Sequence, residues 1–304
     1  MTIKHLVISG GGATGMITYG AAAQLAREKF WQLADIKSIY GCSIGAYIGF
    51  IISLGCDWDW LDDYFIKRPW NKLVAASTIS LIDVYEEKSL LNEQFFTEAI
   101  VPFLKAKDLN ETATLENLYD LTHIELHMYS VNINSSKLEK VDISHKTHPH
   151  LTIIKALRMT MAFPIIFQPV FEGEACYIDG GVLNNFPLND CLAQQILAQH
   201  KAEHQHKAEK DEILAFKNIW TVNKNCISEK SSILDFLLMI MKKTQASLDT
   251  EPEQEEVKHT VRCLVEDLND VSKWIETLSN EETRHKFVEK GKVHANLFLS
   301  YIKP

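Results

Sequence analysis

The sequence predicts an α/β protein with three layers, in which helices cover both faces of a central, mostly parallel sheet. Two short apolar runs, His5–Ser9 and Ile36–Tyr40, each lead into a glycine-bracketed turn, and the helix-like stretch Met16–Phe30 connects them. A strand, helix and strand of this length form a parallel crossover unit. The first run contains branched aliphatic residues and no break, which is typical of a central strand covered on both faces.

Composition restricts the function classes. A chain of 304 residues with 46% hydrophobic content can bury the core of one large domain. The net charge of −9 argues against nucleic acid as a partner, and it leaves only local, mostly apolar contact with a membrane. Oligomeric state has no signature in the sequence.

Several features indicate a cytoplasmic protein, peripheral on membranes at most. Six cysteines without a CxxC pair are typical of reduced thiols. The N-terminus has no signal-peptide pattern, and the longest apolar run, Ile44–Gly55, falls short of the ~20 residues that span a bilayer.

Hydrophobic periodicity predicts the remaining elements. Further helices are expected over Ile44–Leu54, Asp57–Lys67, Ser89–Lys105, His150–Thr160 and Pro187–Gln199. Further strands are expected over Ile124–Ile133, its antiparallel partner Leu138–Ile143, Cys176–Ile178 and, as the last strand, Phe216–Val222. From Ser231 onward only helical patterns are evident, including an amphipathic helix over Val261–Leu278. We therefore expect a first domain over residues 1–225 and a helical C-terminal extension over 226–304 packed on it.

The second turn, Gly41-Cys42-Ser43-Ile44-Gly45, has the Gly-x-Ser-x-Gly pattern of a nucleophile elbow. Such a turn exposes its serine between a strand and the N-terminus of a helix. A serine hydroxyl needs a base to take its proton and donors for the oxyanion that forms. Ser43 is therefore the candidate nucleophile of a serine hydrolase.

The first turn, Gly10 to Gly15, has two interpretations. Free N–H groups at a helix start suit an oxyanion hole, and we expect Gly11 and Gly12, with Gly10, to lie near Ser43 if the two strands end at the same edge. The same residues fit the G-x-G-x-x-G fingerprint of a nucleotide-binding loop. That fingerprint requires an acidic residue at the end of the second strand, whereas Asp35 precedes that strand.

A third motif, Asp179-Gly180-Gly181, follows the short strand Cys176–Ile178. Alone, Asp-Gly is a frequent turn dipeptide. With the two glycine turns, however, it resembles the ordered motif set of the patatin-like phospholipases. A further block of the sequence, TMAFPIIFQP with Ala162, Pro164, Phe167 and Pro169, is similar to the segment that precedes the aspartate in that family.

The resemblance covers roughly residues 5–225 and implies a patatin-like fold with a lipid acyl hydrolase activity. It implies a two-residue dyad of Ser43 as nucleophile and Asp179 as base, with no metal and no cofactor. The supporting glycines would be Gly15, Gly41, Gly45, Gly180 and Gly181. The substrate would be a phospholipid or another lipid ester, reached by transient contact with a membrane surface. Because an ordinary aspartate has a pKa of about 3.9, this base requires a desolvated site that raises it.

Thr14 departs from the family pattern, which has Arg or Lys before the last glycine of the first turn. An alternative is therefore a patatin-fold protein that binds lipid or a partner without turnover. Histidines offer a second alternative as base, in two groups: His145, His148 and His150, and His200, His204 and His206. The apolar run Ile233–Met241 is a candidate lid beside a lipid-binding cleft.

Overall fold

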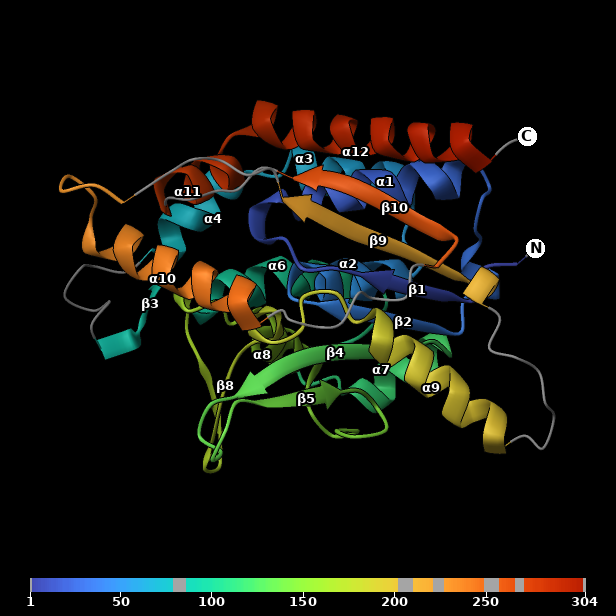
Figure 1. The fold of residues 1–304 in the computed structure, drawn as a ribbon, viewed down its shortest axis with the longest axis horizontal. Helices are drawn as coiled ribbons and strands as arrows, with labels where there is room; N and C mark the ends of the chain where they lie inside the picture. Colours follow the sequence, from blue (N-terminus) through green and yellow to red (C-terminus); the bar gives the residue numbers. More distant parts are fainter. Residues whose placement is uncertain are drawn as a thin grey trace.

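The computed structural model describes residues 2–78, 86–201, 210–220, 227–248, 257–265 and 271–302. These residues form three layers, with helices on both sides of a central sheet, as the sequence predicts (Figure 1). The main sheet has the strand order β10-β9-β1-β2-β4-β8-β7, with β5 paired to β4. Its strands are β1 (His5–Ile8), β2 (Ser38–Cys42), β4 (Glu125–Asn132), β5 (Glu139–Ile143), β7 (Val170–Glu172), β8 (Ala175–Asp179), β9 (Ile213–Trp220) and β10 (His259–Val265).

The five strands from β10 to β4 are mutually parallel, whereas β5 and β8 run antiparallel to β4. Successive side chains of β1 and β9 point to opposite faces of the sheet. Leu6 and Phe216 belong to the larger core, which contains residues of α1 (Gly15–Arg27), α2 (Ile44–Ser53) and α12 (Glu281–Ile302). Val7 and Ala215 belong to a smaller core with residues of α9 (Leu188–Lys201).

The other helices surround the larger core, and a second, two-stranded sheet lies apart from the main one. These elements are α3 (Trp58–Ile66), α4 (Trp70–Ser77), α6 (Glu93–Lys105), α7 (Leu115–Thr122), α8 (Ile153–Met161), α10 (Ile233–Leu248) and α11 (Val271–Ser279), with β3 (Ser89–Leu91) and β6 (Ile165–Phe167) in the small sheet.

The register of β4 brings the carboxyl ends of β2 and β8 together. Cys42, the last residue of β2, pairs with Tyr129, and Asp179, the last residue of β8, pairs with the next residue, Ser130. Because β2 runs parallel to β4 and β8 runs antiparallel to it, the two strands end head to head beside one point of β4. Ser43 immediately follows β2, so it lies next to Asp179.

Helix α12 lies along α1 (Figure 1). Two glycines allow this close approach: a Cβ on Gly291 would lie 2.0 Å from the Ile17 carbonyl oxygen, and a Cβ on Gly20 would lie 2.2 Å from that of Val288. Arg284 of α12 is buried and donates to four backbone carbonyls, three of them at the end of α3 and just beyond it. The C-terminal helices are thus part of the same packed body.

Two predictions about elements are wrong. Residues 259–265 form strand β10 and not the start of an amphipathic helix, so β9 is not the last strand. In β10 the buried residues alternate, with Val261, Cys263 and Val265 inward, and pairing with β9 selects this period of two over the helical one. Ser89–Lys105 is also not one helix, because β3 ends before Asn92, whose side chain caps α6 by accepting from the Gln94 N–H. Among the described helices, none is both long and apolar enough to cross a membrane.

Candidate active site

Ser43 lies at a sharp turn between β2 and α2. Its backbone has φ 53° and ψ −128°, a region that non-glycine residues enter only where the surroundings force it. The backbone around this turn is tightly packed: a Cβ on Gly45 would lie 2.3 Å from the Ile8 carbonyl oxygen, and one on Gly41 would lie 2.6 Å from the backbone of Ala46. These two glycines therefore let α2 start tight against β1 and β2, with the Ser43 side chain at the tip of the turn.

The Ser43 hydroxyl donates to Asp179, with 2.5 Å between Oγ and Oδ2. The other carboxyl oxygen of Asp179 accepts from the Gly181 N–H at 2.8 Å. Asp179 is only 2% exposed, and this burial raises its pKa to about 6, although the hydrogen bonds from Ser43 and Gly181 favour the ionised form. The carboxyl group thus has the raised pKa that a base of this kind requires.

Thr160, at the end of α8, holds the backbone of Ser43. The Ser43 N–H donates to the Thr160 hydroxyl at 3.1 Å, and that hydroxyl donates to the Tyr129 carbonyl at 2.5 Å. The Asp179 N–H donates to the Ala162 carbonyl at 3.0 Å, so the same segment also holds the aspartate. Sequence reasoning missed Thr160, although it is the first residue of the TMAFPIIFQP block.

The glycine turn after β1 lies beside Ser43. A Cβ on Gly10 would lie 3.2 Å from the Ser43 Cβ, and β1 and β2 end together with Ile8 paired to Gly41. The Gly10 N–H donates to the Asn185 carbonyl at 2.9 Å. The N–H groups of Gly11 and Gly12, in contrast, have no hydrogen-bond partner among the described residues.

The remaining supporting glycines also lie at close contacts. A Cβ on Gly15 would lie 2.6 Å from the Ile44 side chain, one on Gly180 would lie 2.1 Å from the Tyr129 carbonyl oxygen, and one on Gly181 would lie 3.0 Å from Asp179 Oδ1. Together these glycines bring the three motifs within contact distance of one another.

Thr14 is fully buried, and its hydroxyl donates to the Gly11 carbonyl at 2.7 Å. The side chain at this position therefore bonds the glycine turn itself.

The candidate histidines whose side chains the structure describes make their contacts away from Ser43 and Asp179. His145 stacks on Tyr119 with ring centroids 3.8 Å apart, His148 contacts Thr147, and His150 lies 3.7 Å from Glu116. His204 and His206 lie outside the described residues, as does the side chain of His200.

The C-terminal region also reaches the site. Gln245 of α10 donates to the Gly181 carbonyl, and the indole nitrogen of Trp274 on α11 would lie 3.0 Å from a Cβ on Gly12. Helix α10 is thus attached to the turn Asp179-Gly180-Gly181 (the aspartate turn), and α11 covers the glycine turn. Helix α10 also exposes a stripe of large apolar residues at helical spacing: Ile233, Phe236, Leu237 and Ile240.

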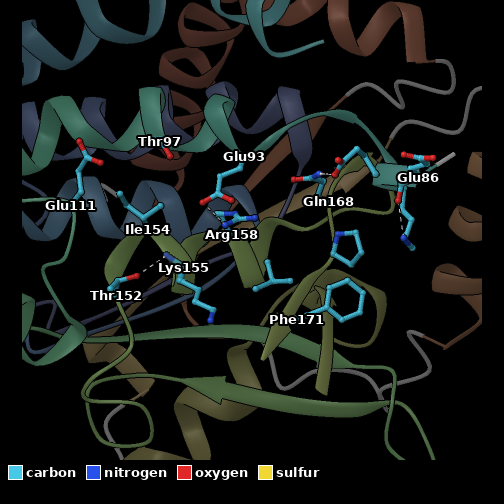
Figure 2. A pocket seen from close by; sticks show the side chains of 14 residues that line it. Glu86, Glu93, Thr97, Glu111, Thr152, Ile154, Lys155, Arg158, Gln168 and Phe171 are labelled. Carbon is cyan, nitrogen blue, oxygen red and sulfur yellow. Dashed lines mark hydrogen bonds and ion pairs between the residues drawn. The ribbon is translucent and has the colours of Figure 1, made fainter. Parts of the chain in front are cut away.

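A separate cavity of about 680 Å³ lies beside α6, α8 and β7 (Figure 2). Half of its lining residues are charged, with Arg158 ion-paired to Glu93 at 2.7 Å and Lys155 reaching toward Glu172. Neither member of the serine–aspartate pair lines it. A charged lining does not suit a fatty-acyl chain.

The described residues contain no cluster of three or more His, Cys, Asp or Glu side chains arranged to hold a metal ion. Five of the six cysteines lie within the described ranges and are free thiols, and Cys226 lies outside those ranges.

The chain is similar in sequence to two viral proteins and in fold to a solved bacterial structure. It is 26% identical over 231 residues to a probable lipid hydrolase, 463L, of Invertebrate iridescent virus 6, covering 74% of this chain and 73% of that protein. It is 27% identical over 187 residues to the uncharacterised protein R571 of Acanthamoeba polyphaga mimivirus, covering 61% of this chain and 60% of that protein. Among solved structures, VipD from Legionella pneumophila has the same fold, with a TM-score of 0.52 at 16% identity over 99% of this chain and 67% of that one.

The sequence model of one family, patatin-like phospholipase, matches residues 6–192. This range starts in β1, contains Ser43 and Asp179, and covers more than half of the 304 residues. The chain therefore belongs to the patatin-like phospholipase family.

Proposed function

We propose that this protein is a lipid acyl hydrolase, of phospholipase A or esterase type, that cleaves fatty-acyl ester bonds without a metal or cofactor. Ser43 is the nucleophile and Asp179 is its base. The observation that carries the proposal is the 2.5 Å contact between Ser43 Oγ and the buried Asp179 carboxyl group at a nucleophile elbow. Family membership supports the substrate class.

The reaction proceeds in two halves. Asp179 takes the Ser43 proton as Oγ attacks the ester carbonyl, and it then gives that proton to the departing alkoxide, which leaves an acyl-enzyme. In the second half Asp179 takes a proton from water, the hydroxide attacks the acyl carbonyl, and the proton returns to Ser43 Oγ. A pKa of about 6 lets Asp179 both accept and release a proton near neutral pH.

The oxyanion formed in each half is stabilised by the N–H groups of Gly11 and Gly12. Both groups lie in the turn next to Ser43, and neither has a hydrogen-bond partner within the described ranges. Gly10 contributes by its missing side chain, which lets the turn approach the Ser43 Cβ. The supporting glycines keep the remaining backbone segments close enough for this arrangement.

The substrate is a phospholipid or another lipid ester, presented at a membrane surface that the protein contacts transiently from the cytoplasm. The exposed stripe on α10 supports this contact, because its apolar residues lie on a helix attached to the Asp179 turn. Residues 1–225 carry the acyl hydrolase chemistry, and the described parts of residues 226–304 pack on them and add strand β10 to the same sheet.

Two measurements test this proposal. We expect a fluorophosphonate probe to label wild-type protein at Ser43, and we expect wild type, but not Ser43→Ala, to hydrolyse a simple fatty-acyl ester. A folded wild-type protein without label or turnover would refute it. In that case the second candidate function is a patatin-fold protein that binds lipid without turnover, which the missing positive charge at Thr14 favours.

A further inference from the structure

The two N–H groups proposed for the oxyanion hole each belong to a peptide unit whose carbonyl is held from the opposite side. The Gly10 carbonyl accepts from the side-chain amides of Asn218 at 2.9 Å and Asn185 at 3.1 Å. The Gly11 carbonyl accepts from the Thr14 hydroxyl at 2.7 Å and the Thr14 N–H at 3.2 Å.

In a planar trans peptide the carbonyl of one residue and the N–H of the next point in opposite directions. A donor that fixes the Gly10 carbonyl therefore also sets the direction of the Gly11 N–H. In the same way, a donor on the Gly11 carbonyl sets the direction of the Gly12 N–H. Each bond also polarises the peptide that it holds, which strengthens the N–H as a donor.

We propose that Thr14 and Asn218 are positioning residues of the esterase reaction, which aim the Gly12 and Gly11 N–H groups at the oxyanion. The inference rests on the proposed function and adds to it two residues that do not touch the substrate. Thr14 thereby contributes to oxyanion stabilisation through the backbone and without a charge.

Asn218 is itself held in one orientation. Its side-chain oxygen accepts from the Thr18 hydroxyl at 2.8 Å, which turns its amide nitrogen toward the Gly10 carbonyl. Its backbone N–H donates to the Ser9 hydroxyl at 2.9 Å, and the residue is only 7% exposed. Reversing this amide would leave buried polar groups unpaired, so the orientation is stable.

The two paths enter the turn from different places. Asn218 lies on β9, the strand that pairs with β1, and its side chain reaches the glycine turn from there. Thr14 lies within the turn itself, at the start of α1. Mutations at the two positions therefore perturb neighbouring peptides through independent contacts.

The first experiment compares Thr14→Val with Thr14→Ser. Valine keeps the shape and loses the hydroxyl, while serine keeps the hydroxyl. We expect Thr14→Val to lower kcat for a fatty-acyl ester by about 10-fold to 100-fold, below the ~10²–10³-fold cost of removing an oxyanion donor outright. KM should stay unchanged, and Thr14→Ser should recover most of kcat. The control is Thr122→Val, which removes a comparable bond to the Leu118 carbonyl in α7, away from the site.

The second experiment measures a property that a merely structural role would not change. Sulfur accepts hydrogen bonds more weakly than oxygen, so a thionoester gains less than the matching ester from aligned N–H groups. We expect Thr14→Val and the isosteric Asn218→Asp to reduce the ratio of kcat/KM for the ester to that for the thionoester. Thr122→Val should leave this ratio at the wild-type value.

Equal losses on both substrates, or equal kcat for Thr14→Val and wild type, would overturn the inference while leaving the esterase proposal intact. Failure of wild type to hydrolyse either ester would instead refute the proposed function. If Thr14→Val does not fold, Asn218→Asp carries the same comparison. Asn218→Asp replaces the amide donor with an oxygen that cannot bond the Gly10 carbonyl when ionised.

Discussion

Replacing Asp179 with asparagine should abolish turnover and at the same time stabilise the fold at neutral pH. The carboxyl group is buried, and its pKa of about 6 in the folded protein exceeds the 3.8 of an unperturbed aspartate. This difference of roughly two pKa values corresponds to ~3 kcal/mol of unfavourable free energy when the group is ionised in the fold. Asparagine removes the charge and keeps an oxygen for the Gly181 N–H.

The sign of the effect sets the pH window. Below about pH 3.8 the aspartate is protonated in both states, so its pKa difference contributes nothing. As pH rises, the unfolded chain loses its proton first, which favours unfolding, and the penalty is complete above about pH 6. The advantage of Asp179→Asn should therefore be near zero at pH 4 and reach ~2–3 kcal/mol at pH 8.

Urea unfolding of wild type and Asp179→Asn at pH 4, 6 and 8 measures this difference directly. Asp35→Asn, which neutralises an exposed carboxyl group, is the control and should change stability little at any of these pH values. In wild type, kcat/KM should fall as pH drops through about 6, because the base must be ionised. A variant that is less stable than wild type at pH 8, or a gain independent of pH, would refute this reasoning.

Three further predictions concern the elbow, the C-terminal packing and a buried histidine. Ser43→Gly should be ~1–2 kcal/mol more stable than Ser43→Ala in urea unfolding, because glycine relieves the strained φ of 53°; equal stabilities would contradict the strain. Gly291→Ala should lower the free energy of unfolding by more than ~2 kcal/mol, because its Cβ would meet the Ile17 carbonyl oxygen. The control is Gly173→Ala, whose Cβ would have nothing within 4 Å; it should cost only ~1 kcal/mol, from the positive φ alone. Similar losses for the two variants would argue against tight packing of α12 on α1. Burial lowers the pKa of His127, but the hydrogen bond to Asp142 and the Glu125 carboxylate 3.6 Å away outweigh this and raise it to about 9. Because the pKa of His127 in the folded protein exceeds its unfolded pKa of 6.5, the residue contributes up to ~3 kcal/mol of stability below pH 6.5, and this contribution is lost as pH rises through 9. A His127→Asn protein whose stability falls equally over the same pH range would refute the assignment.

Those parts of the site that consist of contiguous residues were predictable from the sequence. The elbow around Ser43 is one turn, and the steric need for Gly41 and Gly45 is local to it. The glycine turn likewise follows its strand directly. The aspartate motif was recognisable from the sequence, but its distance to Ser43 depends on the register of β4, which pairs Tyr129 with Cys42 and Ser130 with Asp179.

Residues that support the site from a distance could not be predicted. Thr160 bonds Ser43 across 117 positions, and Asn218 bonds Gly10 across 208, and a single threonine or asparagine has no periodicity that reveals such a contact. The only sequence signal at Thr14 is the positive charge that it lacks relative to the family pattern. Its bond to the Gly11 carbonyl depends on the backbone conformation of the turn, which residue types alone do not specify.

The misassigned strand β10 shows how far the site depends on the C-terminal region. β10 pairs with β9 over seven residues, and β9 carries Asn218, which holds the Gly10 carbonyl. Trp274 of α11 lies over Gly12, and Gln245 of α10 bonds Gly181. Without these elements β9 would be an exposed edge strand, and both the glycine turn and the aspartate turn would lose a neighbour. The proposed catalytic motifs end by Gly181, but the residues that orient and cover them extend well beyond, so the described C-terminal elements are a structural component of the candidate site.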